Sequence, residues 1–203
     1  TATTEIYTLS LHDALPISAD KGILVVMNDE IHAAKYVTKT HTTNVATFHT
    51  PTHGPLGIIM KHDILWFKTA EPRVRFDLEQ ITGTVPIIKA YAGMGIGDGI
   101  ISLLDPEKID GVVIEALGAG NLPPLAAREI TNLMEKGVPV VLVSRCFNGI
   151  AEPVYAYEGG GVKLQEAGVM FVKELNAPKA RLKLLIALSA GLKGQELKDY
   201  IEG

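Results

Sequence analysis

The sequence predicts an α/β protein in which a parallel sheet carries helices on both of its faces. The main observation is that, after residue 84, apolar runs of strand length alternate with stretches of helical periodicity. The strand-like runs are 85–91, 111–116 and 138–144, and the helical stretches between them are 98–104 and 125–136. Short turns connect these elements, so we expect a flavodoxin-like or Rossmann-like domain over 85–203.

Helical periodicity is clearest in 125–136, where Lys136 and Gly137 form a typical helix stop. Asp98 is a candidate N-cap for the helix predicted at 98–104. The remaining elements are a helix followed by a strand in 161–175, a helix at 177–190 with Leu182, Leu185, Ile186 and Leu188 toward the core, and a final helix at 195–201.

The preceding part of the chain predicts a strand and a hairpin. The apolar run 22–27 predicts a buried strand that ends at Asn28 and Asp29. A loop rich in proline and glycine follows at 47–57, and then 57–60 and 64–67 form the predicted hairpin. Residues 69–84 are charged and lack a sustained apolar period, so the predicted organisation is 19–68, a linker at 69–84, and the domain 85–203.

Residues 1–18 do not fit this pattern. They contain no Lys or Arg, and His12 and Asp13 interrupt the apolar residues, which argues against a secretory signal. Residues 4–18 resemble a translated sequencing adapter. We therefore expect 1–18 to be non-native and the native sequence to begin near Ala19, the alternative being a genuine linker or short helix.

Composition excludes several classes of function. The net charge of −4, without a basic run, argues against nucleic acid and anionic membranes as partners. No apolar run approaches the length of a transmembrane helix. The single cysteine, Cys146, ends an apolar run, which predicts a buried and unreactive thiol. No metal site is predicted, because the scattered histidines follow no metal-binding spacing and suit loops: His32, His41, His49, His53 and His62.

Three loops follow strand ends of the predicted sheet, where ligands bind in open parallel sheets. Loop 92–99 is rich in glycine but matches neither common phosphate-binding motif, which favours a flexible turn. Loop 117–124 either brings its glycine backbone and Asn121 to a ligand or is a structural turn that Asn121 caps. The third loop, 144–149, contains Arg145, and Glu158 follows it; the two side chains either bind a charged substrate or pair at the surface.

Segment 37–44 has the highest density of polar donors in the chain. It contains one ammonium, four hydroxyls, an imidazole and an amide, with no acid among them. A lysine among threonines raises the local positive potential and can stabilise the alkoxide of a neighbouring hydroxyl, which makes Lys39 a candidate catalytic residue. The alternative is a polar turn or helix start.

Several of these runs together resemble the bacterial L-asparaginase/glutaminase family. The similar segments follow one another in order: 25–29, 33–48, 54–57, 118–121, 140–145 and 178–181. The resemblance implies hydrolysis of L-asparagine, or of L-glutamine, to the acid and ammonia by an activated threonine, without a cofactor and in a homotetramer. Lys39 matches the motif lysine of the family. Asn121 and Glu158 lie where groups of the carboxyl-terminal domain approach the site of a neighbouring subunit.

The sequence departs from the family at its start. The segment T-G-G-T-I, which carries the nucleophile, and the later T-D pair have no counterpart here. The resemblance therefore implies an amino-terminally truncated chain, in which 19–68 is the end of a larger α/β catalytic domain and 85–203 is nearly whole. We expect such a fragment to be inactive alone. The alternative is a non-catalytic flavodoxin-like binding or assembly module, and the motifs do not separate cytoplasmic from periplasmic members.

Overall fold

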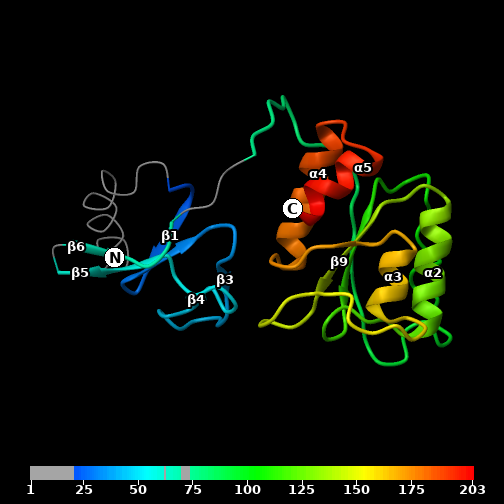
Figure 1. The fold of residues 1–203 in the computed structure, drawn as a ribbon, viewed down its shortest axis with the longest axis horizontal. Helices are drawn as coiled ribbons and strands as arrows, with labels where there is room; N and C mark the ends of the chain where they lie inside the picture. The colour runs from blue at the N-terminus through cyan, green and yellow to red at the C-terminus, as the bar shows by residue number, and fades with distance from the viewer. Residues whose placement is uncertain (1–20, 62, 70–73) are drawn as a thin grey trace. The chain divides into compact units, whose positions relative to one another are not determined.

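The structure is a computed structural model that describes residues 21–61, 63–69 and 74–203 (Figure 1). The chain divides into two compact units, Thr1–Val74 and Arg75–Gly203, and the division falls inside the predicted linker, 69–84. The segment predicted to be non-native, 1–18, lies outside the described residues, and so does His62.

The second unit contains the predicted parallel sheet. Its strands are β7 (Ile87–Lys89), β8 (Val112–Ala116), β9 (Val140–Ser144) and β10 (Met170–Phe171), in the order β10-β9-β8-β7. All three pairings in this sheet are parallel. The central strands β8 and β9 are almost wholly buried. Strands covered on both faces read as continuous apolar runs, which is why the sequence predicted them correctly.

Helices cover both faces of this sheet (Figure 1). The helices α2 (Pro124–Glu135) and α3 (Gly161–Glu166) pack on one face, and α4 (Ala177–Ser189) and α5 (Gly194–Glu202) pack on the other. Alternate residues of β8 separate the two cores, since Val112 and Ile114 join the first and Val113 joins the second. The α/β prediction is therefore confirmed. Among the described residues, no helix is long and apolar enough to cross a lipid bilayer.

Two predictions about the helices of this unit are wrong. Residues 98–104 form turns instead of a helix, because Asp98 accepts a hydrogen bond from the Gly95 amide at 2.7 Å and one from the Tyr91 hydroxyl at 2.5 Å. Asp98 therefore closes a turn and does not cap a helix. In α4, Leu182 is 50% exposed, whereas its neighbour Leu184 is fully buried.

The first unit is built around a four-stranded antiparallel sheet. Its strands are β1 (Leu24–Met27), β2 (Glu30–Ala33), β5 (Gly57–Met60) and β6 (Asp63–Trp66), in the order β1-β2-β5-β6. The predicted strand and hairpin are present, although β1 is only half-buried. Strand β2 was not predicted. Asn28 and Asp29 join it to β1 with φ values of 51° and 60°, as a tight two-residue hairpin requires.

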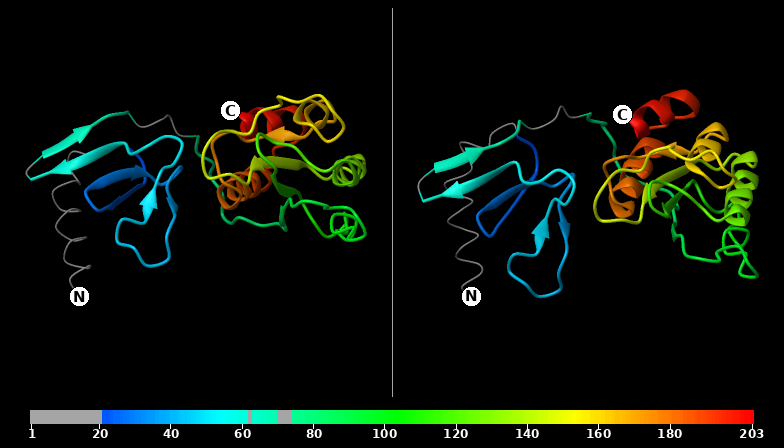
Figure 2. Two further views of the ribbon diagram at one scale, coloured as in Figure 1. Left: turned by 90° about the horizontal axis from the view of Figure 1, so that it is seen from below. Right: turned by 60° about the horizontal axis from the view of Figure 1, so that its bottom comes forward.

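A separate two-stranded ribbon completes this unit. Strands β3 (Thr38–Lys39) and β4 (Phe48–His49) pair antiparallel, so part of the predicted loop 47–57 is a strand (Figure 2). The described buried apolar side chains of this unit are few: Ile31, Val37 and Leu56. The buried polar side chains that the structure describes all lie here too, namely His32, Thr47 and Thr50.

Candidate functional site

Lys39 lies on the β3–β4 ribbon, directly opposite Phe48. Its side chain is exposed, and its ammonium lies over the Phe48 ring at 5.9 Å from the ring centroid. It forms no ion pair with any residue that the structure describes. The ribbon therefore presents the positive charge to solvent, with the aromatic ring beneath it as a weak partner.

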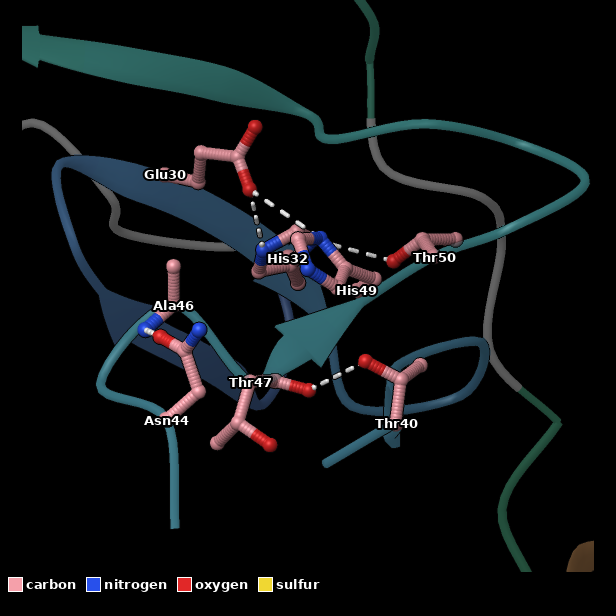
Figure 3. Close-up of polar contacts among 8 residues, drawn as sticks. All are labelled: Glu30, His32, Thr40, Asn44, Ala46, Thr47, His49 and Thr50. Carbon is pink, nitrogen blue, oxygen red and sulfur yellow. Dashed lines mark hydrogen bonds and ion pairs between the residues drawn. The ribbon is translucent and has the colours of Figure 1, made fainter. Parts of the chain in front are cut away.

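Hydrogen bonds within segment 40–47 hold the tip of the ribbon. The Thr47 carbonyl accepts from the Thr40 amide at 2.8 Å and from the Thr40 hydroxyl at 3.0 Å (Figure 3). The Thr47 hydroxyl accepts from the His41 amide at 2.9 Å. The dense polar segment is therefore a bonded ribbon tip and not a helix start.

His41 and Asn44 complete the tip. The Nδ1 atom of His41 accepts from the amides of Thr43 and Asn44 at 3.1 and 3.0 Å. The Oδ1 atom of Asn44 accepts from the Ala46 amide at 2.9 Å (Figure 3). These two bonds hold the His41 ring against the backbone of the ribbon tip.

A second polar cluster lies at the base of the ribbon (Figure 3). The Nδ1 atom of His32 on β2 is 3.0 Å from the Thr50 hydroxyl oxygen, just after β4. Oε2 of Glu30 lies 3.3 Å from Nε2 of His32 and 3.8 Å from Nδ1 of His49. Burial lowers the pKa of His32, and the Glu30 carboxylate opposes this shift in part.

The sequence prediction missed this cluster. His32 and His49 were predicted on loops, but each lies on a strand. The available signal was the spacing of Glu30 and His32, because residues two apart in a strand lie on the same side. In the described part of the chain, no group of three or more His, Cys, Asp or Glu side chains is arranged to hold a metal ion.

Asn121 and Glu158 lie in the second unit, beyond the carboxyl ends of its strands. Oδ1 of Asn121 accepts from the Gly161 amide, the first residue of α3, at 3.3 Å. Glu158 pairs with Arg128, whose Nε and Nη2 atoms lie 2.7 and 2.6 Å from Oε1. Asn121 thus links the loop 117–124 to the start of α3, which is a structural contact within the unit.

Surface pairing of Arg145 with Glu158, one of the two alternatives left open by the sequence, is not formed. Arg145 instead donates from Nη1 to the Ala90 carbonyl at 2.8 Å. Cys146, predicted to be buried, is exposed. The reason is that β9 ends at Ser144, whose hydroxyl accepts from the Cys146 amide at 3.0 Å and turns the chain outward.

Comparison with known families decides what kind of chain carries these features. Residues 84–201, more than half of the chain, match the model described as the glutaminase/asparaginase C-terminal domain. The chain belongs to the glutaminase/asparaginase family. Residues 9–72 match the amino-terminal asparaginase model, and this match begins inside the segment predicted to be non-native.

Relatives of the same family are similar over nearly the whole chain. It is 40% identical to a probable L-asparaginase of Deinococcus radiodurans, covering 90% of this chain and 56% of the relative. It is 31% identical to an L-asparaginase of Bacillus licheniformis, covering 88% and 54%. The crystal structure of a probable cytoplasmic L-asparaginase from Campylobacter jejuni is similar with a TM-score of 0.73 and 26% identity, covering 90% and 55%. The chain thus spans about half the length of the relatives it matches.

Proposed function

We propose that this chain is the carboxyl-terminal part of an L-asparaginase, which hydrolyses L-asparagine, and L-glutamine as the related substrate, to the acid and ammonia. The observation that carries the proposal is the Lys39 ribbon. Its motif segment, 37–44, is held by hydrogen bonds from Thr40 and His41 to Thr47 and presents an ammonium at the surface. The order of the two family matches along the chain supports the same assignment.

In this reaction a threonine hydroxyl loses its proton and attacks the side-chain amide carbon. The C–N bond breaks, and the nitrogen gains a proton, equivalent to the one lost by the threonine, and leaves as ammonia. Water then hydrolyses the ester that remains, which releases the acid and restores the threonine hydroxyl. Lys39 is proposed to stabilise the negative charge on a threonine oxygen. The nucleophile belongs to the upstream part of the protein, and the chemistry needs protein groups and water but no cofactor.

The exposure of Lys39 explains why the fragment alone is proposed to be inactive. Charges in water interact weakly, because solvent and ions screen them. An ammonium that forms no ion pair with a described residue and faces solvent therefore activates a hydroxyl poorly. Upstream residues that cover the ribbon would exclude water and strengthen its field.

Asn121 and Glu158 are proposed to reach the substrate site of a neighbouring subunit in a homotetramer. Both contacts from Arg128 are to Oε1 of Glu158, which leaves Oε2 as an acceptor for the ammonium of an amino-acid substrate. Arg128 would then orient the Glu158 carboxylate without competing with the substrate ammonium for Oε2.

The test begins with the DNA upstream of codon 19. We expect it to encode T-G-G-T and a later T-D pair, and we expect the extended chain to release ammonia from L-asparagine while the 203-residue chain does not. Lys39→Ala in the extended chain should lower kcat by about 100-fold or more, the loss typical of removing one stabilising group. Lys61→Ala, at another exposed lysine of the first unit, is the control.

Two results would contradict the proposal. One is that the native DNA encodes residues 1–18 directly after a start codon, which would support the non-catalytic binding module instead. The other is an extended chain in which Lys39→Ala leaves turnover unchanged.

A further inference from the structure

The ribbon that carries Lys39 is attached to its unit by polar contacts. It belongs to a different sheet from β1-β2-β5-β6, so no strand pairing joins the two. The described buried polar side chains gather at and below the ribbon, although burying such groups is unfavourable unless they are hydrogen-bonded. Their position therefore indicates that specific hydrogen bonds attach the ribbon to the four-stranded sheet.

His32 and Thr50 form the central contact of this attachment. His32 is 1% exposed on β2, Thr50 is 5% exposed just after β4, and their side chains meet at 3.0 Å. Glu30 extends the contact, since one of its oxygens lies near both His32 and His49. His49 pairs with Thr38, the residue next to Lys39, so the contacts end one residue from the lysine.

We propose that Glu30, His32 and Thr50 form a proton-sensitive anchor that positions the Lys39 ribbon: the ribbon is held while His32 is neutral and loosens when His32 is protonated. His32 is then a positioning residue that acts on Lys39 through Thr50. The importance of Lys39 rests on the proposed function, but the anchor itself does not.

The positions of the protons in the contact between His32 and Thr50 explain why it responds to pH. Nε2 of His32 makes no hydrogen bond with a described residue, but the Glu30 carboxylate 3.3 Å away favours the tautomer with its proton on Nε2, in which Nδ1 accepts from the Thr50 hydroxyl. A second proton would occupy Nδ1. The Thr50 hydroxyl would then have to turn and find another acceptor in a buried place, and a positive charge would be buried on His32.

The groups that face His32 set the direction of the pH effect. Glu30, 34% exposed, favours the charged imidazole, and His49, 45% exposed, opposes it when protonated. Burial, together with His49, outweighs Glu30, so the pKa of His32 is lowered from its ordinary value of 6.5. The ribbon should therefore be held at neutral pH and loosen as the pH falls below 6.5.

Hydrogen exchange on the 203-residue chain tests the anchor without any turnover assay. The Thr40 amide, bonded to the Thr47 carbonyl at 2.8 Å, reports on the ribbon, and the Ile59 amide, bonded to the Asp29 carbonyl at 2.8 Å, reports on the sheet. Below pH 6.5, protection of Thr40, corrected for intrinsic exchange, should fall about tenfold relative to Ile59, the effect of losing one buried hydrogen bond. The fall should follow the titration of the His32 ring by NMR.

Three variants sharpen the test. Thr50→Val removes the hydroxyl at nearly constant size and should lower Thr40 protection about tenfold at neutral pH, with Ile59 unchanged. His32→Asn keeps an acceptor near the Nδ1 position but cannot titrate, so protection should persist and the pH step should disappear. Thr131→Val, the same change at a partly buried threonine of the second unit, should leave Thr40 unaffected.

The proposed anchor is refuted if Thr50→Val leaves the protection of the Thr40 amide unchanged. It is also refuted if the variant lowers the protection of the Thr40 and Ile59 amides equally, because that result would show general destabilisation of the unit. A pH step that persists in His32→Asn also overturns it. If His32→Asn does not fold, the Thr50→Val result decides. None of these outcomes depends on asparagine hydrolysis, so failure of the anchor and failure of the proposed function are distinguishable.

Discussion

The hydroxyl of Thr47 bonds both backbone groups of His41. It accepts from the His41 amide at 2.9 Å and donates to the His41 carbonyl at 2.5 Å. One buried side chain thus closes the tip of the ribbon two residues from Lys39. The orientation of the lysine therefore depends on a threonine that carries no charge.

Replacing Thr47 with valine should open this tip. The change keeps the volume of the side chain but removes both bonds to His41, so we expect a loss of about 2 kcal/mol in the stability of the ribbon. Exchange of the His41 amide should rise in proportion. Thr42→Val, at an exposed position of the same segment, should have little effect. Equal exchange of the His41 amide in both variants would show that the Thr47 hydroxyl does not hold the tip.

The glycines of loop 117–124 give a second prediction, because the two have different reasons to be glycine. Gly120 has a φ of 122°, and a Cβ there would lie 2.7 Å from Cε1 of the buried Phe171. Gly118 has a φ of 52°, and a Cβ there would meet no atom within 4 Å. Gly120 therefore serves packing within the domain, and close approach to a ligand is not needed to explain it.

Gly120→Ala should destabilise the second unit by about 3 kcal/mol, the sum of backbone strain and overpacking. Gly118→Ala should cost about 1 kcal/mol, from left-handed strain alone. Urea unfolding followed by circular dichroism measures this, because α2, α3, α4 and α5 all lie in that unit. The fluorescence of Trp66, the single tryptophan, follows the first unit separately. Equal losses in the two variants would refute the packing role of Gly120.

The sequence predicted the second unit well because its signals are local. Strands β8 and β9 are apolar along their length, and Lys136 and Gly137 mark the end of α2 correctly. The helix expected at 98–104 failed because the Asp98 side chain closes a turn with Gly95. Leu182 was misplaced because α4 is apolar on much of its surface, so the sequence alone does not show which face is covered.

The candidate site was predicted only in part, for a different reason. Lys39 was found from the local density of polar residues and from family resemblance. The contact between His32 and Thr50 joins residues 18 apart, and it depends on the placement of β4 against β2. No local pattern encodes that placement, and strand β2, on which Glu30 and His32 lie, was not predicted.

Glu129 gives a prediction about pH. Its carboxylate lies on α2 with Oε2 buried and without a hydrogen-bond partner, near the Asp98 carboxylate. Burial and the Asp98 charge raise the pKa of Glu129, and a hydrogen bond from the Ile101 amide opposes them. The hydrogen bond from Tyr91 lowers the pKa of Asp98, so Asp98 stays charged. At neutral pH, two carboxylates therefore repel each other beside α2.

The sign of the effect follows from proton binding. Between 4.5, the ordinary pKa, and the raised folded value, the folded state binds more protons than the unfolded chain, so stability falls as the pH rises through this interval. Glu129→Gln should therefore stabilise the second unit at neutral pH, by up to about 1 kcal/mol. The gain over the wild type should shrink as the pH approaches 4.5. Glu107→Gln, the same change at an exposed turn, should alter stability little. A Glu129→Gln gain that is independent of pH would show that repulsion at this carboxylate is not its cause.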